Sequence, residues 1–165
     1  ATASLARSLS PLIWNAARRS QPKSSRLAAA RWSHELLSHI DAPNAYHLLC
    51  FLSGDDDATV SMIAKQAMGV DKTLGEDINL SSWTKDDSIN LPSFGEIMSS
   101  VVRSKSRPKY TEFHLRAQAA SLRFMVHSLF SEESFYGDEL GGDELRIFVS
   151  VILDTLSSYR GRSMS

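Results

Sequence analysis

The chain has 165 residues, of which 42% are hydrophobic and 22% are charged, with a net charge of −1 and a single cysteine. These values are typical of one folded domain, and one cysteine excludes an intrachain disulfide. The longest uncharged run covers residues 42–54, which is short of the ~18 apolar residues that a transmembrane helix needs. The sequence therefore predicts no transmembrane segment, although peripheral association with a membrane stays open.

The first 33 residues differ in composition from the rest of the chain. They contain six basic residues and no Asp or Glu, whereas the remaining residues carry a net charge of −7. A segment rich in Ala, Ser and Arg and free of acids is typical of an organelle transit peptide. We therefore expect an address in the mitochondrial matrix or at the matrix face of the inner membrane, with the plastid as second choice. A basic arm that binds RNA or anionic lipid is the alternative.

The same segment suggests where the chain divides. The stretch "ARWSHELL" resembles the cleavage motif of mitochondrial presequences, in which Arg lies two residues before the cut, so the bond after Trp32 would be cleaved. Pro11 predicts that this segment forms two short helical pieces at best. We expect residues 1–32 to be a presequence, disordered or an amphipathic helix, and residues 33–165 to be a helical domain.

Helix signals begin directly after the expected cut. Ser33 can cap one helix and Asp41 a second one, in which Pro43 occupies the first turn and Gly54 marks the end. Residues 48–52 are apolar on almost every side, which predicts a buried central helix.

A third helix is expected between Asp57, its N-cap, and Gly69, its end. Its apolar residues recur at the spacing of one helix face, namely Val60, Ile63, Ala64, Ala67 and Met68. Residues 70–92 contain the triplet Ile-Asn-Leu twice among turn-forming residues. This pattern fits a small hairpin or an ordered loop.

Three capping signals divide the C-terminal half. Ser93 and Glu96 form a capping box, Thr111 can cap the longest helix, and Asp143 can cap a final helix that ends near Gly161.

The last two helices carry apolar residues in alternating steps of four and three, the spacing of a helix–helix seam. The first set is Leu115, Ala119, Leu122, Val126 and Leu129, and the second is Leu145, Val149, Ile152, Leu156 and Tyr159. We expect the two seams to pack antiparallel against each other. The run 147–153 could also form a buried strand, but the longer pattern favours a helix. The sequence as a whole predicts an all-α, single-domain bundle of about five helices.

Residue patterns typical of catalysis or metal binding are missing from the sequence. None of the five histidines has another at helical ligand spacing, and no cysteine pair could complete a zinc site. Cys50 lies in an apolar helix, where a neutral, unreactive thiol is favoured. Neither a Gly-x-Ser-x-Gly elbow nor a Gly-rich phosphate loop occurs. We therefore expect no catalytic residue, no cofactor and no metal.

One basic stretch remains as a candidate binding element. Arg103, Lys105, Arg107 and Lys109 alternate along the chain, with Tyr110 beside them. In an extended strand all four cations would point to one side and could bind phosphates or an acidic partner. The charge of −7 disfavours nucleic acid as the main ligand. A solvated linker between helices is the alternative interpretation.

The apolar excess of the final helix indicates burial against another protein, with Phe148 and Val151 as the candidate contacts. We expect a non-catalytic accessory subunit or assembly factor of a mitochondrial complex, such as the respiratory chain, ATP synthase or ribosome, whose partners are other subunits. One alternative is a small helical enzyme with a site assembled from scattered residues such as His47, His114, His127 and Asp154. Another is an adaptor that binds RNA or anionic lipid through residues 103–109.

Overall fold

The computed structural model describes residues 2–37, 42–68, 92–105, 112–130 and 142–163. Within these ranges the chain forms seven α-helices and no strand. The helices are α1 (Thr2–Ala16), α2 (Lys23–Leu37), α3 (Ala42–Ser53), α4 (Ala58–Ala67), α5 (Phe94–Lys105), α6 (Glu112–Phe130) and α7 (Gly142–Ser163). The prediction of an all-α bundle is confirmed, and residues 145–159 are helical.

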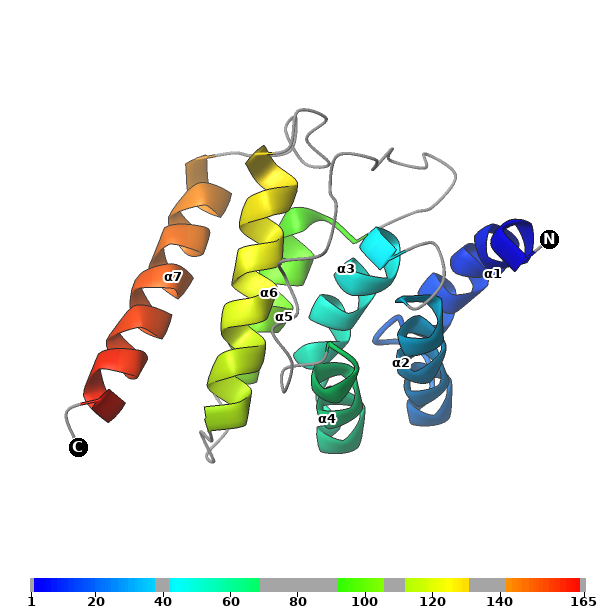
Figure 1. Cartoon of the computed structure of the whole chain (residues 1–165), viewed down its shortest axis with the longest axis horizontal. Helices are drawn as coiled ribbons and strands as arrows, with labels where there is room; N and C mark the ends of the chain where they lie inside the picture. The colour runs from blue at the N-terminus through cyan, green and yellow to red at the C-terminus, as the bar shows by residue number, and fades with distance from the viewer. Residues whose placement is uncertain (1, 38–41, 69–91, 106–111, 131–141, 164–165) are drawn as a thin grey trace.

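The helices stand in a row, with α1 at one end and α7 at the other (Figure 1). Every extensive contact among the described residues joins helices that are neighbours or next-but-one neighbours along the chain. The closest association is among α2, α3 and α4, and α5 connects this group to α6 and α7. Each helix is therefore stabilised mainly by those next to it, as in repeat proteins.

The core is centred on α3. Leu48, Leu49, Cys50 and Leu52 have at most 1% of their surface exposed, as expected for a helix with almost no polar side. Burial of each such large apolar side chain contributes about 1.5–3 kcal/mol. Val60 and Ala64 of α4 and Met68 at its C-cap are also fully buried, which confirms the predicted apolar face of that helix.

Two N-termini follow the capping rules. The carboxylate of Asp57 accepts hydrogen bonds from the backbone N–H groups of Thr59 and Val60 at 2.9 and 3.1 Å, which caps α4. At the start of α5, the backbone N–H of Ser93 donates to Glu96 at 2.9 Å, and the backbone N–H of Glu96 donates to the hydroxyl of Ser93 at 3.2 Å. The predicted capping box is confirmed.

Gly54 ends α3 as predicted, and its position also requires a glycine for a second reason. A Cβ atom at this residue would lie 1.8 Å from the carbonyl oxygen of Ser100. Because that atom belongs to the backbone of α5, it cannot move aside cheaply. The absence of a side chain at Gly54 therefore sets how closely α3 and α5 approach.

The structure differs from the sequence-based expectation in the first 37 residues, where α2 takes the place of the short helix expected from Ser33 and α1 adds a further helix. α1 continues through Pro11, and α2 runs past Trp32 to Leu37. Ser33 was expected to cap a new helix, but it lies inside α2, is fully buried, and donates to the carbonyl of Ala29 at 2.7 Å. The expected hairpin or loop at 70–92 lies outside the described residues except for Pro92.

α1 and α2 are packed on the rest of the chain. α1 buries Ile13 and Trp14, and α2 buries Ala29 and Ala30. Since alanines keep side chains short, α2 can approach α3 and α4 closely. Among the described helices, none combines the length and the apolar composition that crossing a bilayer requires.

The cap of α4 predicts a pH-dependent stability. Asp57 lies 3.0 Å from the ammonium of Lys23, and this contact, followed by the hydrogen bonds from the helix backbone, holds the pKa of Asp57 below its ordinary 3.8. When a carboxyl group has a lower pKa in the folded chain than in the unfolded chain, its charge stabilises the fold at pH values above the unfolded-state pKa. This stabilisation is lost as the pH falls through the folded-state pKa. Asp57→Ala should therefore lower the melting temperature at pH 7, and the gap to wild type should narrow below pH 3.8.

Thermal unfolding followed by circular dichroism at several pH values measures this gap. Asp56→Ala is the matched control, because the Asp56 carboxylate is 79% exposed and lies 3.9 Å from Arg103. If both variants lost the same melting temperature, or if the difference between Asp57→Ala and wild type did not change with pH, Asp57 would not have the assigned role as the charged cap of α4.

Candidate interaction surfaces

A buried carboxylate lies at the turn between α3 and α4. Asp55 has no exposed side-chain surface. Arg26 of α2 approaches it with two nitrogens, Nε at 2.9 Å from Oδ2 and Nη2 at 3.2 Å from Oδ1. The backbone N–H of Asp57 also donates to Oδ1 at 2.9 Å. A charge that would be costly to bury alone thus has a bidentate partner and a further hydrogen bond.

Arg19, between α1 and α2, is the second cation at this turn. Its Nη1 lies 3.2 Å from Asp55 Oδ2 without hydrogen-bond geometry, so this contact is Coulombic. Its Nη2 donates to the carbonyl of Gly54 at 2.9 Å and to the hydroxyl of Ser100 at 2.8 Å, and its guanidinium lies 5.0 Å from the ring centre of Phe51. Partial burial lowers the pKa of Arg19 and Asp55 opposes this, but a guanidinium stays charged at neutral pH.

We call Arg19, Arg26 and Asp55 the arginine clamp. It joins the segment that the sequence marked as a presequence to the turn between α3 and α4, and through Ser100 to α5. The expected domain boundary between Trp32 and Ser33 lies within α2, on the C-terminal side of both arginines.

The predicted basic stretch is only partly described. Arg103 is exposed and belongs to α5, which continues to Lys105. Because this part is helical and not extended, the backbone positions of Arg103 and Lys105 are about 200° apart around the helix, so the expected alignment of cations does not hold there. Arg107, Lys109 and Tyr110 lie outside the described residues.

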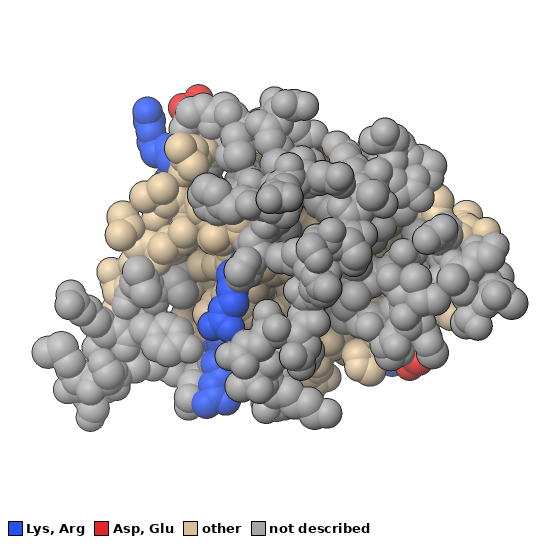
Figure 2. All heavy atoms as spheres, turned by 45° about the horizontal axis from the view of Figure 1, so that its top comes forward, with Lys and Arg blue, Asp and Glu red and all other residues tan. Residues whose placement is uncertain are grey.

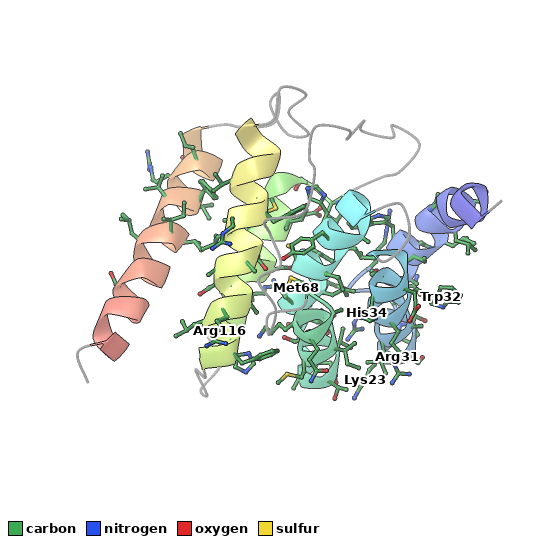
Figure 3. The ribbon with its side chains drawn as sticks, viewed as in Figure 1. Lys23, Arg31, Trp32, His34, Met68 and Arg116 are labelled. Atoms are coloured by element: carbon green, nitrogen blue, oxygen red, sulfur yellow. The ribbon has the colours of Figure 1, made fainter. Side chains whose placement is uncertain are left out.

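Exposed cations outside the predicted basic stretch occur on α6. Figure 2 shows Lys or Arg side chains in a line over the part of the surface where α6 runs. The exposed arginines of that helix are Arg116 and Arg123, and Arg116 lies toward the N-terminal end of α6 (Figure 3). A spacing of seven places both on one side of the helix, a signal that the sequence already contained.

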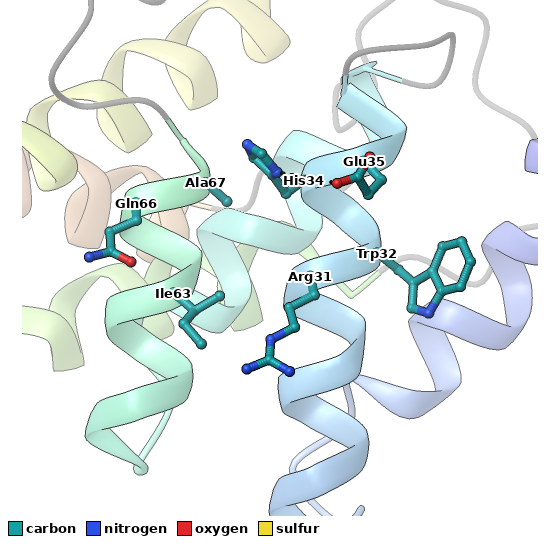
Figure 4. Close-up of a pocket in the computed structure, with 7 residues that line it drawn as sticks. All are labelled: Arg31, Trp32, His34, Glu35, Ile63, Gln66 and Ala67. Carbon is teal, nitrogen blue, oxygen red and sulfur yellow. Dashed lines mark ion pairs between the residues drawn. The ribbon is translucent and has the colours of Figure 1, made fainter.

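A groove of about 430 Å³ lies between α2 and α4. Arg31, Trp32, His34 and Glu35 line it from α2, and Ile63, Gln66 and Ala67 line it from α4 (Figure 4). The ion pair marked there joins His34 and Glu35 at 4.0 Å, and both side chains are more than 60% exposed. Such a solvated pair contributes little to the stability of the fold.

The residues of the alternative enzyme hypothesis have different surroundings. His47 is fully buried, with its ring centre 4.6 Å from that of Phe124. His114 Nδ1 lies 2.8 Å from the Nζ of buried Lys65. Asp154 is exposed on α7, and the side chain of His127 is not among those described. The described residues contain no group of three or more His, Cys, Asp or Glu side chains that could hold a metal ion.

Cys50 has the surroundings that the sequence predicts. The residue is fully buried in α3, and burial raises the pKa of its thiol to about 12. The thiol is therefore protonated and a poor nucleophile at neutral pH.

The two candidate contact residues of the final helix point inward. Phe148 and Val151 are 5% and 6% exposed, on the side of α7 that packs toward α5 and α6. Leu145 and Val149 were expected in an internal seam, but they are 51% and 46% exposed. Ile152 of the same expected seam is partly buried and packs against the core. The periodicity of α7 therefore placed Ile152 correctly and Leu145 and Val149 wrongly.

An apolar row therefore lies on the outside of the last helix. Leu145, Val149 and Leu153, at i, i+4 and i+8, lie side by side along α7 and are all about half exposed. We call these three residues the α7 stripe. α7 itself lies at the end of the row of helices in Figure 1.

Comparison of the chain with protein-family models, with curated proteins and with solved structures finds no match.

The arginine clamp predicts a large loss of stability when its charge balance is broken. Asp55→Asn keeps the side-chain size and an acceptor for the Asp57 N–H, but it leaves two partly buried guanidinium groups without their counter-charge. The free energy of unfolding should fall by about 3 kcal/mol. Because buried pairs are weakly screened, the loss should persist at high salt. Urea denaturation at low and high salt measures both quantities.

Arg18→Ala is the matched control, since Arg18 is exposed next to the clamp. It should change the free energy of unfolding by no more than about 0.5 kcal/mol. If Asp55→Asn were as mild as this control, the clamp would not hold the N-terminal helices in place.

Proposed function

We propose that this protein is a non-catalytic accessory subunit or assembly factor of a larger mitochondrial complex, and that it docks through the outside of α7. The α7 stripe is the observation that carries the proposal. Helices at the end of a stacked row normally have a polar outer face, because nothing covers them. The three residues of the stripe are 51%, 46% and 59% exposed instead. A contiguous exposed apolar strip is typical of a protein contact.

The interior polar groups support a structural role rather than catalysis. The hydroxyls of Ser53, Ser61 and Ser121 donate to backbone carbonyls at 2.7, 2.6 and 3.0 Å. The amide of Gln118 donates to the carbonyl of Val101 at 3.3 Å. These groups are hydrogen-bonded to the backbone of the bundle, as buried polar groups in a packed interior usually are.

The proposed mitochondrial address rests on the acid-free composition of the first 33 residues. The arginine clamp gives Arg19 and Arg26 a second use, because both cations bind Asp55. The two uses are compatible if the segment crosses the membrane unfolded and then folds against α3 and α4. Removal of residues 1–32 would leave the buried carboxylate without either arginine, which typically costs several kcal/mol. We therefore propose that this segment stays attached after import.

A site-specific photo-crosslinker tests the docking role. With benzoylphenylalanine at Val149, irradiation of cells should give a cross-linked product of defined mass, because this position lies at the centre of the α7 stripe. The crosslinker at Met62 of α4, which is 36% exposed, is the control and should give no such product. Equal yields at both positions, or none at Val149, would refute docking through α7.

Fractionation of cells that express a C-terminally tagged chain tests the address and the fate of the N-terminus. We expect the protein in the protease-protected matrix fraction, with peptides from residues 1–32 present in its mass spectrum. Recovery in the cytosol would refute the address. A matrix protein that begins at Ser33 would refute retention of the segment and leave the address standing.

A further inference from the structure

We infer that the groove between α2 and α4 binds a small monocarboxylate with an apolar chain or ring, and that Arg31 binds its carboxylate. The volume of the groove, about 430 Å³, lies in the range of small-molecule pockets. This inference is independent of the docking role proposed for α7, because it concerns a different surface of the bundle.

Arg31 is the cation of α2 that the fold leaves unpaired. The helix carries three Lys or Arg residues, namely Lys23, Arg26 and Arg31. The ammonium of Lys23 lies 3.0 Å from Asp57, and Arg26 belongs to the arginine clamp. No hydrogen bond or ion pair joins Arg31 to another residue within the described ranges. Its charge is therefore available to a ligand.

The side chain of Arg31 extends into the space between the two helices, and Ile63 extends into the same space from α4 (Figure 4). Glu35, the acid of the lining, is paired with His34 at 4.0 Å and not with Arg31. The groove thus presents a free guanidinium beside apolar surface, to which Ala67 also contributes.

These features define the class of ligand. One unpaired guanidinium matches one negative charge, and two parallel N–H groups of a guanidinium match the two oxygens of a carboxylate. Ile63 and Ala67 offer contacts to an apolar chain or ring on the same molecule. A few polar groups that fix orientation beside an apolar wall are typical of small-molecule sites.

The length of the groove favours a small molecule over a peptide. The lining spans residues 31–35 of α2 and 63–67 of α4, which is about 6 Å along each helix axis. A peptide helix that binds in a groove uses contacts from i to i+7, or about 10 Å. The lined surface is too short for such a helix.

Isothermal titration calorimetry of the purified full chain with octanoate tests the inference. We expect saturable binding with a dissociation constant of about 1 mM or tighter. Octylammonium, which has the same chain and the opposite charge, should bind at least about tenfold more weakly, because it would face Arg31 with a like charge.

Two pairs of variants locate the site. Arg31→Gln removes the charge and should weaken octanoate binding by about tenfold or more, whereas Arg18→Gln, at an exposed arginine outside the groove, should not change it. Ile63→Ser removes apolar contacts and should weaken binding by about fourfold or more. Met62→Ser, at the adjacent residue outside the lining, is its control. Melting curves establish that each variant is folded.

Four results would overturn the inference. They are a wild type that shows no saturable binding of octanoate, octylammonium that binds as tightly as octanoate, Arg31→Gln that retains wild-type affinity, and Arg18→Gln that weakens binding as much as Arg31→Gln. The second result would indicate apolar adsorption alone, and the fourth would indicate a general effect of charge. Arg31→Gln lies at an exposed position, so it tests the site even if Ile63→Ser does not fold.

Discussion

The buried charge of Asp55 constrains the arrangement of the first hundred residues. A carboxylate with no exposed surface must have cations within reach, and both come from the N-terminal segment, 29 residues before it in the case of Arg26. Arg19 extends the constraint to α5 through Ser100, 81 residues away. This contact exists only because Gly54 lets the backbone of α5 approach α3. One charge therefore brings together the α1–α2 connection, the α3–α4 turn and α5.

Local chemistry explains which parts of this fold could be predicted from the sequence. The cap at Asp57 and the capping box at Ser93 and Glu96 depend on residues two or three positions apart, and such short-range patterns are visible in a sequence. The clamp depends on partners about thirty positions apart, which no local pattern identifies. The excess of arginines before Glu35 therefore predicts an address or a basic arm with short helical pieces, and it does not predict that α1 and α2 pack into the bundle.

The final helix illustrates a different limit of prediction from the sequence. Its spacing predicted a helix correctly, but α7 carries apolar residues on more than one side, and periodicity does not tell which side meets the core. Phe148 and Val151 pack inward, whereas Leu145 and Val149 remain outside. The choice is made by tertiary packing against α5 and α6. Because α7 has apolar residues on more than one side, packing one side against the bundle leaves another apolar row exposed, where a partner could bind.

The stacked arrangement also decides where binding can affect stability. In a row of helices each element is held by its neighbours, and the two ends are attached differently. α2 has a buried ion pair with Asp55 and close contact with α3 and α4, whereas the contacts of α7 with α5 and α6 are less extensive. A helix with fewer contacts opens more readily, and a partner that binds only its docked form stabilises it. Binding to the α7 stripe should therefore stabilise the packed form of α7. Docking of a partner and packing of α7 on the bundle are thermodynamically linked in this way.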